Sequence, residues 1–126
     1  MTDGAPLGRE RYVSLATFRR DGTQVKTPVW FAVLDGKLYV VTAGEAGKVK
    51  RLRRSPRALV AASDARGGVR GGWQDATARI VTDRATTERA HTALVAKYGW
   101  QARLLDLLSR LAGRIRRRAW IEIELR

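Results

Sequence analysis

The sequence predicts a mainly β fold with short helices, arranged as a six-stranded antiparallel barrel, closed or split. Two Asp-Gly pairs, at Asp21 and Asp35, each follow a run rich in β-forming residues, which is a strong hairpin signal. Later strand-like runs alternate with short amphipathic segments. A closed or split barrel suits these elements better than an open sheet, because closure removes exposed edges. The length suits one domain, residues 1–126, in which we expect residues 1–10 to be a flexible N-terminal segment.

The first three strands are expected to form a meander. Residues 11–20 contain Tyr12, Val13 and Phe18 and end at the first Asp-Gly pair. Residues 24–34 end at the second pair. Residues 37–43 alternate apolar and mixed positions, as a half-buried strand does.

A short basic helix follows between Gly47 and Ser55-Pro56, because proline disfavours helix in the residue before it. Val49 and Leu52, three residues apart, form its apolar stripe. Helical spacing then divides its cations into two pairs: Lys48 with Arg51 beside that stripe, and Lys50 with Arg54 on the solvent side.

The remaining chain predicts two strands, two helices and a final strand. The strands cover residues 57–65 and 69–82, the second interrupted at Gly71-Gly72, where a bulge or close backbone approach is expected. The helices cover residues 86–98 and 101–112, and the last strand covers residues 118–125. The predicted order is therefore βββαββααβ.

Composition restricts the chemistry. The chain has 25 Lys and Arg against 12 Asp and Glu, a net charge of +13 that attracts anions such as nucleic acid, anionic lipid or a charged cofactor. It has no cysteine and one histidine, which excludes disulfides, thiolate metal sites, multi-His metal sites and a Ser-His-Asp triad within one chain. No apolar run has the length of a membrane span and no signal peptide is visible, so we expect a cytoplasmic protein without a metal.

Two stretches are candidate binding elements. Thr27-Pro28-Val29-Trp30-Phe31 places a proline inside a strand, which indicates either an ordinary edge strand or a backbone against which a flat ring docks. Thr42, at the end of a strand, precedes a glycine-containing turn and Lys48, a pattern that suits a phosphate cradle or simple turn chemistry.

The stretch KVKRLRRSPR has three interpretations: a solvated helix face, a nucleic-acid surface, or a socket for one anion. The second basic cluster, residues 114–118, is either a phosphate contact or a solvated loop. Other conspicuous residues have structural explanations. Large aromatic residues normally pack in a core or an interface, which is the default interpretation of Trp73, Trp100 and Trp120. His91 is interpreted as a surface or packing residue. Glu122 and Glu124 give poor support for catalysis by a pair of acid and base carboxyl groups.

The segments RYVSLATFRRDGTQVKTPVWF, GKLYVVTA, GKVKRLRRSPRALVA and WQDATARIV, in this order, resemble the pyridoxamine-phosphate-oxidase-like split-barrel superfamily, whose fold is the FMN-binding split-barrel type. More closely, they resemble its small bacterial enzymes that use the deazaflavin coenzyme F-420. The resemblance implies a homodimer with cofactor sites at the interface. It implies that the ring lies against Thr27, Pro28, Val29 and Trp30, and that the phosphate is held by Thr42, Lys48, Lys50 and Arg51. Relatives often carry Asn at the position of Arg51.

The implied activity is hydride transfer between the reduced coenzyme and an unidentified organic substrate, with the cofactor supplying the chemistry. The phosphodiester and oligoglutamate tail of F-420 make it a polyanion, which suits a protein of charge +13. FMN is the alternative cofactor. A non-catalytic cofactor carrier and a nucleic-acid-binding basic β-barrel are the alternative functions, although no specific nucleic-acid partner is expected.

Overall fold

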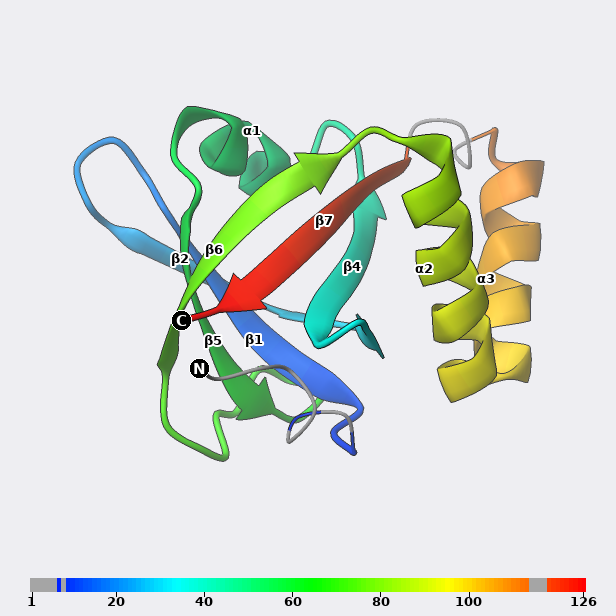
Figure 1. Ribbon diagram of the computed structural model, residues 1–126, viewed down its shortest axis with the longest axis horizontal. Helices are drawn as coiled ribbons and strands as arrows, with labels where there is room; N and C mark the ends of the chain where they lie inside the picture. Colours follow the sequence, from blue (N-terminus) through cyan, green and yellow to red (C-terminus); the bar gives the residue numbers. More distant parts are fainter. Residues whose placement is uncertain (1–6, 8, 114–117) are drawn as a thin grey trace.

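The computed structural model describes residues 7, 9–113 and 118–126. These residues form seven strands and three helices, which Figure 1 colours in sequence order from blue to red. Their bounds are β1 Tyr12–Phe18, β2 Gln24–Val29, β3 Ala32–Leu34, β4 Lys37–Ala43, α1 Gly47–Arg54, β5 Arg57–Ser63, β6 Gln74–Val81, α2 Arg84–Tyr98, α3 Trp100–Leu111 and β7 Arg118–Leu125.

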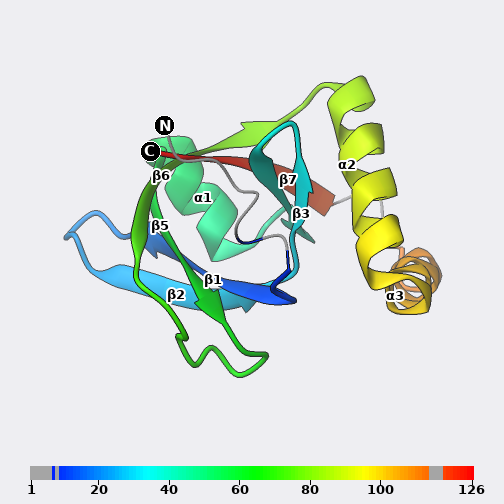
Figure 2. The same cartoon turned by 60° about the horizontal axis from the view of Figure 1, so that its bottom comes forward.

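The strands form one curled antiparallel sheet in the order β2-β1-β5-β6-β7-β4-β3. Helix α1 lies over one opening of the curl, and α2 and α3 form a layer to one side of it (Figure 1). The curl is visible from a second direction in Figure 2. The architecture is that of a split barrel, as the sequence predicts.

The prediction of six strands is wrong, because residues 24–34 form two strands. Strand β2 pairs with β1, whereas β3 pairs with β4 at the opposite edge of the sheet. The chain leaves one edge and joins the other at Trp30 and Phe31. The N–H of Phe31 donates to the hydroxyl of Tyr98 over 3.1 Å, so the break leaves that donor satisfied.

The second strand of the later pair is also shorter than predicted. Strand β6 begins at Gln74, and Val69 contributes only an isolated bridge to Ser63. Asp64 accepts hydrogen bonds from the N–H groups of Arg66 and Gly68, which holds this segment in a turn. The glycine-rich stretch after it therefore stays outside the ladder.

Two cores share the sheet. The larger fills the inside of the curl and includes Leu15, Phe31, Val40 and Ile121. The smaller lies between the outer face and α2, where Trp120 is buried. Side chains along β4 point alternately to the two cores: Leu38 and Val40 belong to the inner core, and Tyr39 belongs to the outer one.

The remaining sequence predictions have mixed outcomes. Trp120 belongs to the core, but Trp100 is 70% exposed and does not pack in the chain's own core. Leu7 is buried, while most of the N-terminal segment expected to be flexible lies outside the described residues. None of the three described helices has the length and apolar character needed to cross a bilayer.

Candidate anion and cofactor site

Helix α1 holds two half-buried cations beside its apolar stripe, and one of them is bound to β1. Val49 and Leu52 are buried, and the flanking Lys48 and Arg51 are half-buried beside them. The Nε of Arg51 donates to the hydroxyl of Thr17 over 2.6 Å, and Thr17 itself is fully buried. The division of the helix that the sequence predicts is therefore confirmed for this pair.

Gly47 makes room for the guanidinium of Arg51. A Cβ placed on Gly47 would lie 2.7 Å from Nη1 of Arg51, which is shorter than any real contact. A larger residue at position 47 would have to displace the guanidinium. The glycine at the helix start thus leaves space for the guanidinium that Thr17 anchors.

The cations of this region lack neutralising carboxylates. Burial lowers the pKa of Lys48, and the neighbouring Arg51 lowers it further. Burial also lowers the pKa of Arg51, with a smaller contribution from Arg19. Within the described residues, none of these three forms an ion pair. Partly buried, unpaired cations are costly unless an anion joins them, so the arrangement suits anion binding.

Two further arginines border the same region. Arg54 donates from Nη2 to the carbonyl of Phe18 over 2.6 Å, so this exposed residue is not simply solvated as its predicted position suggests. The guanidinium of Arg57 lies 4.2 Å from the centre of the Phe18 ring. Both contacts draw cations toward the end of β1.

The other two predicted phosphate residues lie elsewhere around α1. Lys50 is exposed and lines a shallow hollow with Gly44, Glu45 and Arg53. Thr42 lies on β4 opposite Ala119 of β7. It lines a cavity of about 200 Å³ against α3, together with Glu45, Leu105, Ser109 and Arg118. The described contacts bring Lys48 and Arg51 together, but do not join Thr42 to them.

The predicted ring-binding segment begins on the edge strand β2. Pro28 is exposed there, and an edge strand tolerates its missing N–H. Thr27 pairs with Leu15 and Thr17 with Val25, so the two threonines are diagonal neighbours on one face, roughly 7–8 Å apart. The hydroxyl oxygen of Thr27 is buried and has no hydrogen-bond partner among the described residues. Buried hydroxyl groups normally form a hydrogen bond, so this one is available to a bound ligand.

The end of this segment is built into the protein. Val29 belongs to the inner core, and the indole of Trp30 stacks on the Tyr98 ring at 4.4 Å and 7°. The Tyr98 hydroxyl also donates to the carbonyl of Arg11 over 2.6 Å. Burial raises the pKa of Tyr98 to about 12, so it remains a neutral donor. One face of Trp30 is therefore already covered.

A buried ammonium group on α2 was not foreseen from the sequence. Nζ of Lys97 lies 3.4 Å from the centre of the Phe31 ring and, within the described chain, has no hydrogen-bond partner. Burial lowers the pKa of Lys97 to about 8, with a further contribution from Arg11. The aromatic face offsets part of the cost of burying the charge. In the sequence, the helical spacing of residues 86–98 indicates no more for Lys97 than a place on one face of the helix.

His91 also has a more specific place than a surface residue. Its Nε2 donates to Asp106 of α3 over 2.7 Å, and Arg118 of β7 donates to the same carboxylate over 2.7 Å. Burial opposes ionisation of Asp106, but the hydrogen bonds from Arg118 and His91 outweigh it and lower its pKa. His91 and Arg118 border an open hollow of about 770 Å³ between α2 and β7. Of the basic cluster 114–118, only Arg118 lies within the described residues.

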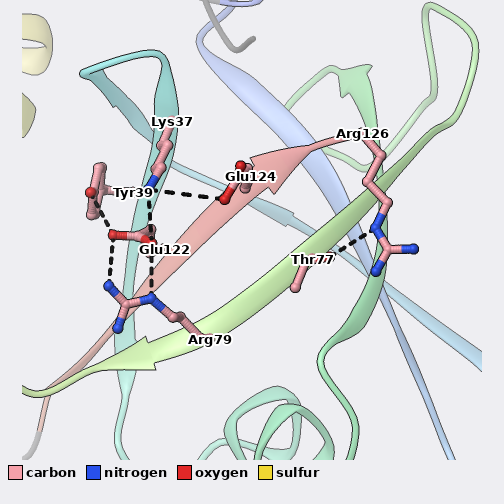
Figure 3. Close-up of polar contacts among 7 residues, drawn as sticks. All are labelled: Lys37, Tyr39, Thr77, Arg79, Glu122, Glu124 and Arg126. Atoms are coloured by element: carbon pink, nitrogen blue, oxygen red, sulfur yellow. Dashed lines mark hydrogen bonds and ion pairs between the residues drawn. The ribbon is translucent and has the colours of Figure 1, made fainter. Parts of the chain in front are cut away.

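The carboxylates of β7 form a structural network, which Figure 3 shows on the outer face of the sheet. Glu122, whose side chain is 8% exposed, accepts hydrogen bonds from Tyr39 at 2.7 Å and from Arg79 at 2.9 and 3.1 Å. Burial alone would raise the pKa of Glu122, but the bonds from Tyr39 and Arg79 lower it. Burial and Glu122 raise the pKa of Tyr39 to about 12. Glu122 is thus a fixed anion rather than a proton carrier.

The curled sheet, with a basic helix at one opening, is the arrangement of a split-barrel protein. The family described as Pyridoxamine 5'-phosphate oxidase matches residues 5–126, and the chain belongs to this family. No curated protein matches the chain.

Solved structures with the same fold include proteins of different kinds. The conserved hypothetical protein Rv2991 from Mycobacterium tuberculosis is 24% identical, with a TM-score of 0.74 over 95% of this chain and 76% of that one. The heme storage protein HutZ from Vibrio cholerae is 13% identical, with a TM-score of 0.73 over 100% and 92%. An FAD-binding protein from Mesorhizobium loti is 20% identical, with a TM-score of 0.63 over 94% and 82%. At these identities the likeness concerns the fold.

Proposed function

We propose that this protein is a coenzyme F-420-dependent oxidoreductase that transfers hydride between the reduced deazaflavin and an organic substrate. The observation that carries the proposal is the pair Lys48 and Arg51 on α1, which has no ion-pair partner among the described residues and of which Arg51 is held against β1. A half-buried charge without a partner is stabilised when an anion binds beside it. The coenzyme's phosphodiester supplies one.

The residues near this pair fit such a group. The hydroxyl of Thr27 is buried without a partner on the same face as Thr17, to which Arg51 is bound. A hydroxyl there can bond a polar group of the cofactor. Pro28 lies on the exposed edge strand β2 and has no backbone N–H, so a flat ring can lie against the backbone there. When bound, the coenzyme supplies the hydride chemistry.

The protein's own residues would then have distinct tasks. Lys48 and Arg51 bind the phosphate, and Tyr98 fixes Trp30 and the chain break beside the ring-binding segment. Lys50 and Arg53, both exposed, attract the acidic tail rather than bind one fixed group. Thr42, in its cavity against α3, lies in a separate part of the site that a second subunit would complete. A homodimer with interfacial sites is part of the proposal.

A flavin is the second candidate cofactor, and FMN is the flavin that the family resemblance implies; a protein of this fold from Mesorhizobium loti binds a related flavin, FAD. Both cofactors carry a phosphate and a flat tricyclic ring, so the Lys48–Arg51 pair does not distinguish them. The net charge of +13 favours F-420, whose tail adds further negative charges.

The test is a titration of the purified protein with F-420 and, separately, with FMN, followed by cofactor fluorescence. We expect F-420 to bind more tightly. Lys48→Ala and Arg51→Ala should each weaken binding by about tenfold to a hundredfold, since a hydrogen bond to a charged group contributes about 1.5–3 kcal/mol. Lys50→Ala should have a smaller effect because Lys50 is exposed.

Arg20→Ala is the matched control, because it removes an exposed charge from outside α1. If Lys48→Ala and Arg51→Ala bind as the wild type does, the site is wrong. Tighter binding of FMN would show that the cofactor is wrong while the site stands. Tight F-420 binding without turnover across a broad substrate panel would identify a carrier instead of an enzyme.

A further inference from the structure

Helix α3 carries a large apolar surface that faces away from the protein. Of its twelve residues only Ala102 is buried. Leu105, which is 40% exposed, lies off to one side of the helix. The other exposed apolar side chains recur three, four or seven residues apart, so they line one side of the helix. They are Trp100 at 70%, Leu104 at 46%, Leu107 at 53%, Leu108 at 54% and Leu111 at 76% exposure. We call this surface the α3 face.

Polar contacts on the other side of α3 hold the helix in this orientation. Asp106 accepts hydrogen bonds from His91 of α2 and Arg118 of β7, and Ser109 accepts one from Arg118 over 3.0 Å. Asp106 and Ser109 lie three residues apart, so both anchor the same side. Turning the α3 face inward would break these bonds and leave Arg118 unpaired. The outward position is therefore built into the fold.

The charges beside the α3 face are all positive. Arg103 and Arg110, both exposed and two turns apart, lie along one flank of it. Asp106 is the single acidic residue in the helix sequence WQARLLDLLSRL, and it is engaged on the inward side. The α3 face thus combines tryptophan and leucine with flanking arginine.

The figures show that nothing in the described chain covers this side. Helix α3 is the outermost element of the helical layer, with α2 between most of it and the sheet (Figures 1 and 2). An exposed apolar strip of this extent in a folded protein marks an interaction surface.

We propose that the α3 face binds the surface of a bilayer that contains anionic lipids. A helix with leucine and tryptophan on one side and arginine beside them is suited to lie in the plane of the lipid headgroups. Anionic lipids also complement both the flanking arginines and the net charge of +13. A second copy docked through the α3 face would instead bring two identical cationic flanks together. Charge therefore favours lipid as the occupant.

The experiment is sedimentation of the full chain with vesicles of pure phosphatidylcholine or of phosphatidylcholine mixed with phosphatidylglycerol. We expect binding to the mixed vesicles and little to the pure ones. Arg103→Gln combined with Arg110→Gln should weaken binding about thirtyfold, because each cation near an anionic surface contributes about fivefold. Trp100→Ser combined with Leu111→Ser should weaken it at least as much; both side chains are mostly exposed, so folding is preserved.

Arg20→Gln combined with Arg66→Gln is the matched control, since it removes the same charge at exposed positions away from α3. An equal loss in this control would reduce the effect to general electrostatics and overturn the proposal. Unchanged vesicle binding by the variant with Trp100→Ser and Leu111→Ser would also overturn the proposal. Light scattering on the protein without lipid tests the second copy: if the Trp100 and Leu111 substitutions convert a dimer to a monomer, the face is a subunit interface and not a lipid surface.

Discussion

Helices α1 and α3 are both amphipathic and both basic, yet they turn opposite sides to the protein. Helix α1 buries Val49 and Leu52 and leaves most of its cations at the surface. Helix α3 turns Asp106 and Ser109 inward and leaves its leucines exposed. The comparison shows that amphipathic spacing defines two sides of a helix without saying which one is buried. For α3, hydrogen bonds to a distant strand decide it.

The largest expected difference between the two helices is in stability. Leu52→Ala should lower the free energy of unfolding by about 2–5 kcal/mol, because Leu52 is buried in the inner core. Leu107→Ala on α3 should change it by less than about 0.5 kcal/mol, because that side chain is about half exposed. Urea denaturation of both variants measures the difference. Equal losses would mean that the α3 face is covered within the chain, against the comparison.

A smaller effect is expected from the clamp that orients α3. Asp106→Asn should lower the free energy of unfolding at pH 7 by about 1–3 kcal/mol, since it weakens charged hydrogen bonds to His91 and Arg118. The pKa of Asp106 is lowered in the folded state, so the carboxylate stabilises the fold above the ordinary value of 3.8. That contribution is lost as pH falls below 3.8 through the folded-state pKa.

The wild type and Asp106→Asn should therefore converge in stability toward low pH, which denaturation at several pH values can follow. Asp64→Asn is the comparison variant for these measurements. The Asp64 carboxylate is also hydrogen-bonded, but only to the N–H groups of its own surface turn. A gap between wild type and Asp106→Asn that is constant with pH would contradict the role assigned to the ionised carboxylate.

A small stability effect, but a clear binding effect, is expected at Gly47. Gly47→Ala improves helix propensity but forces the guanidinium of Arg51 to move, so the free energy of unfolding should change by less than about 1 kcal/mol. Binding of F-420 should nevertheless weaken by about tenfold, the loss of roughly one hydrogen bond to a charged group. Denaturation and cofactor titration of one variant separate the two effects. Unchanged binding would show that the position of Arg51 is unimportant.

Local pattern was enough to predict most elements. The alternation in Lys37–Ala43 and the Asp-Gly turn before it gave the bounds of β4 correctly. At this turn Asp35 and Gly36 have φ of 54° and 76°, the left-handed values that such pairs adopt. The sides of α1 were also predictable, because Val49 and Leu52 are its only apolar pair.

Features that depend on distant residues were not predictable. The break at Trp30 and Phe31 relies on the hydroxyl of Tyr98, 67 residues from Phe31. The anchor of Arg51 is Thr17, 34 residues away, and nothing in the local pattern marks Thr17 as a partner. That the phosphate residues assigned from the family resemblance act together stays a prediction, since Thr42 lines a cavity to which neither Lys48 nor Arg51 contributes.

The two residues between β2 and β3 have a consequence for how the sheet can move. These strands are the opposite ends of a seven-stranded sheet, yet Val29 and Ala32 are three residues apart. A chain segment of that length spans at most about 11 Å. The covalent chain therefore acts as a short tether between the two edges, and the sheet cannot flatten without losing pairing at β2 or β3. Opening of the barrel must begin by peeling an edge strand, and hydrogen exchange there would report it first.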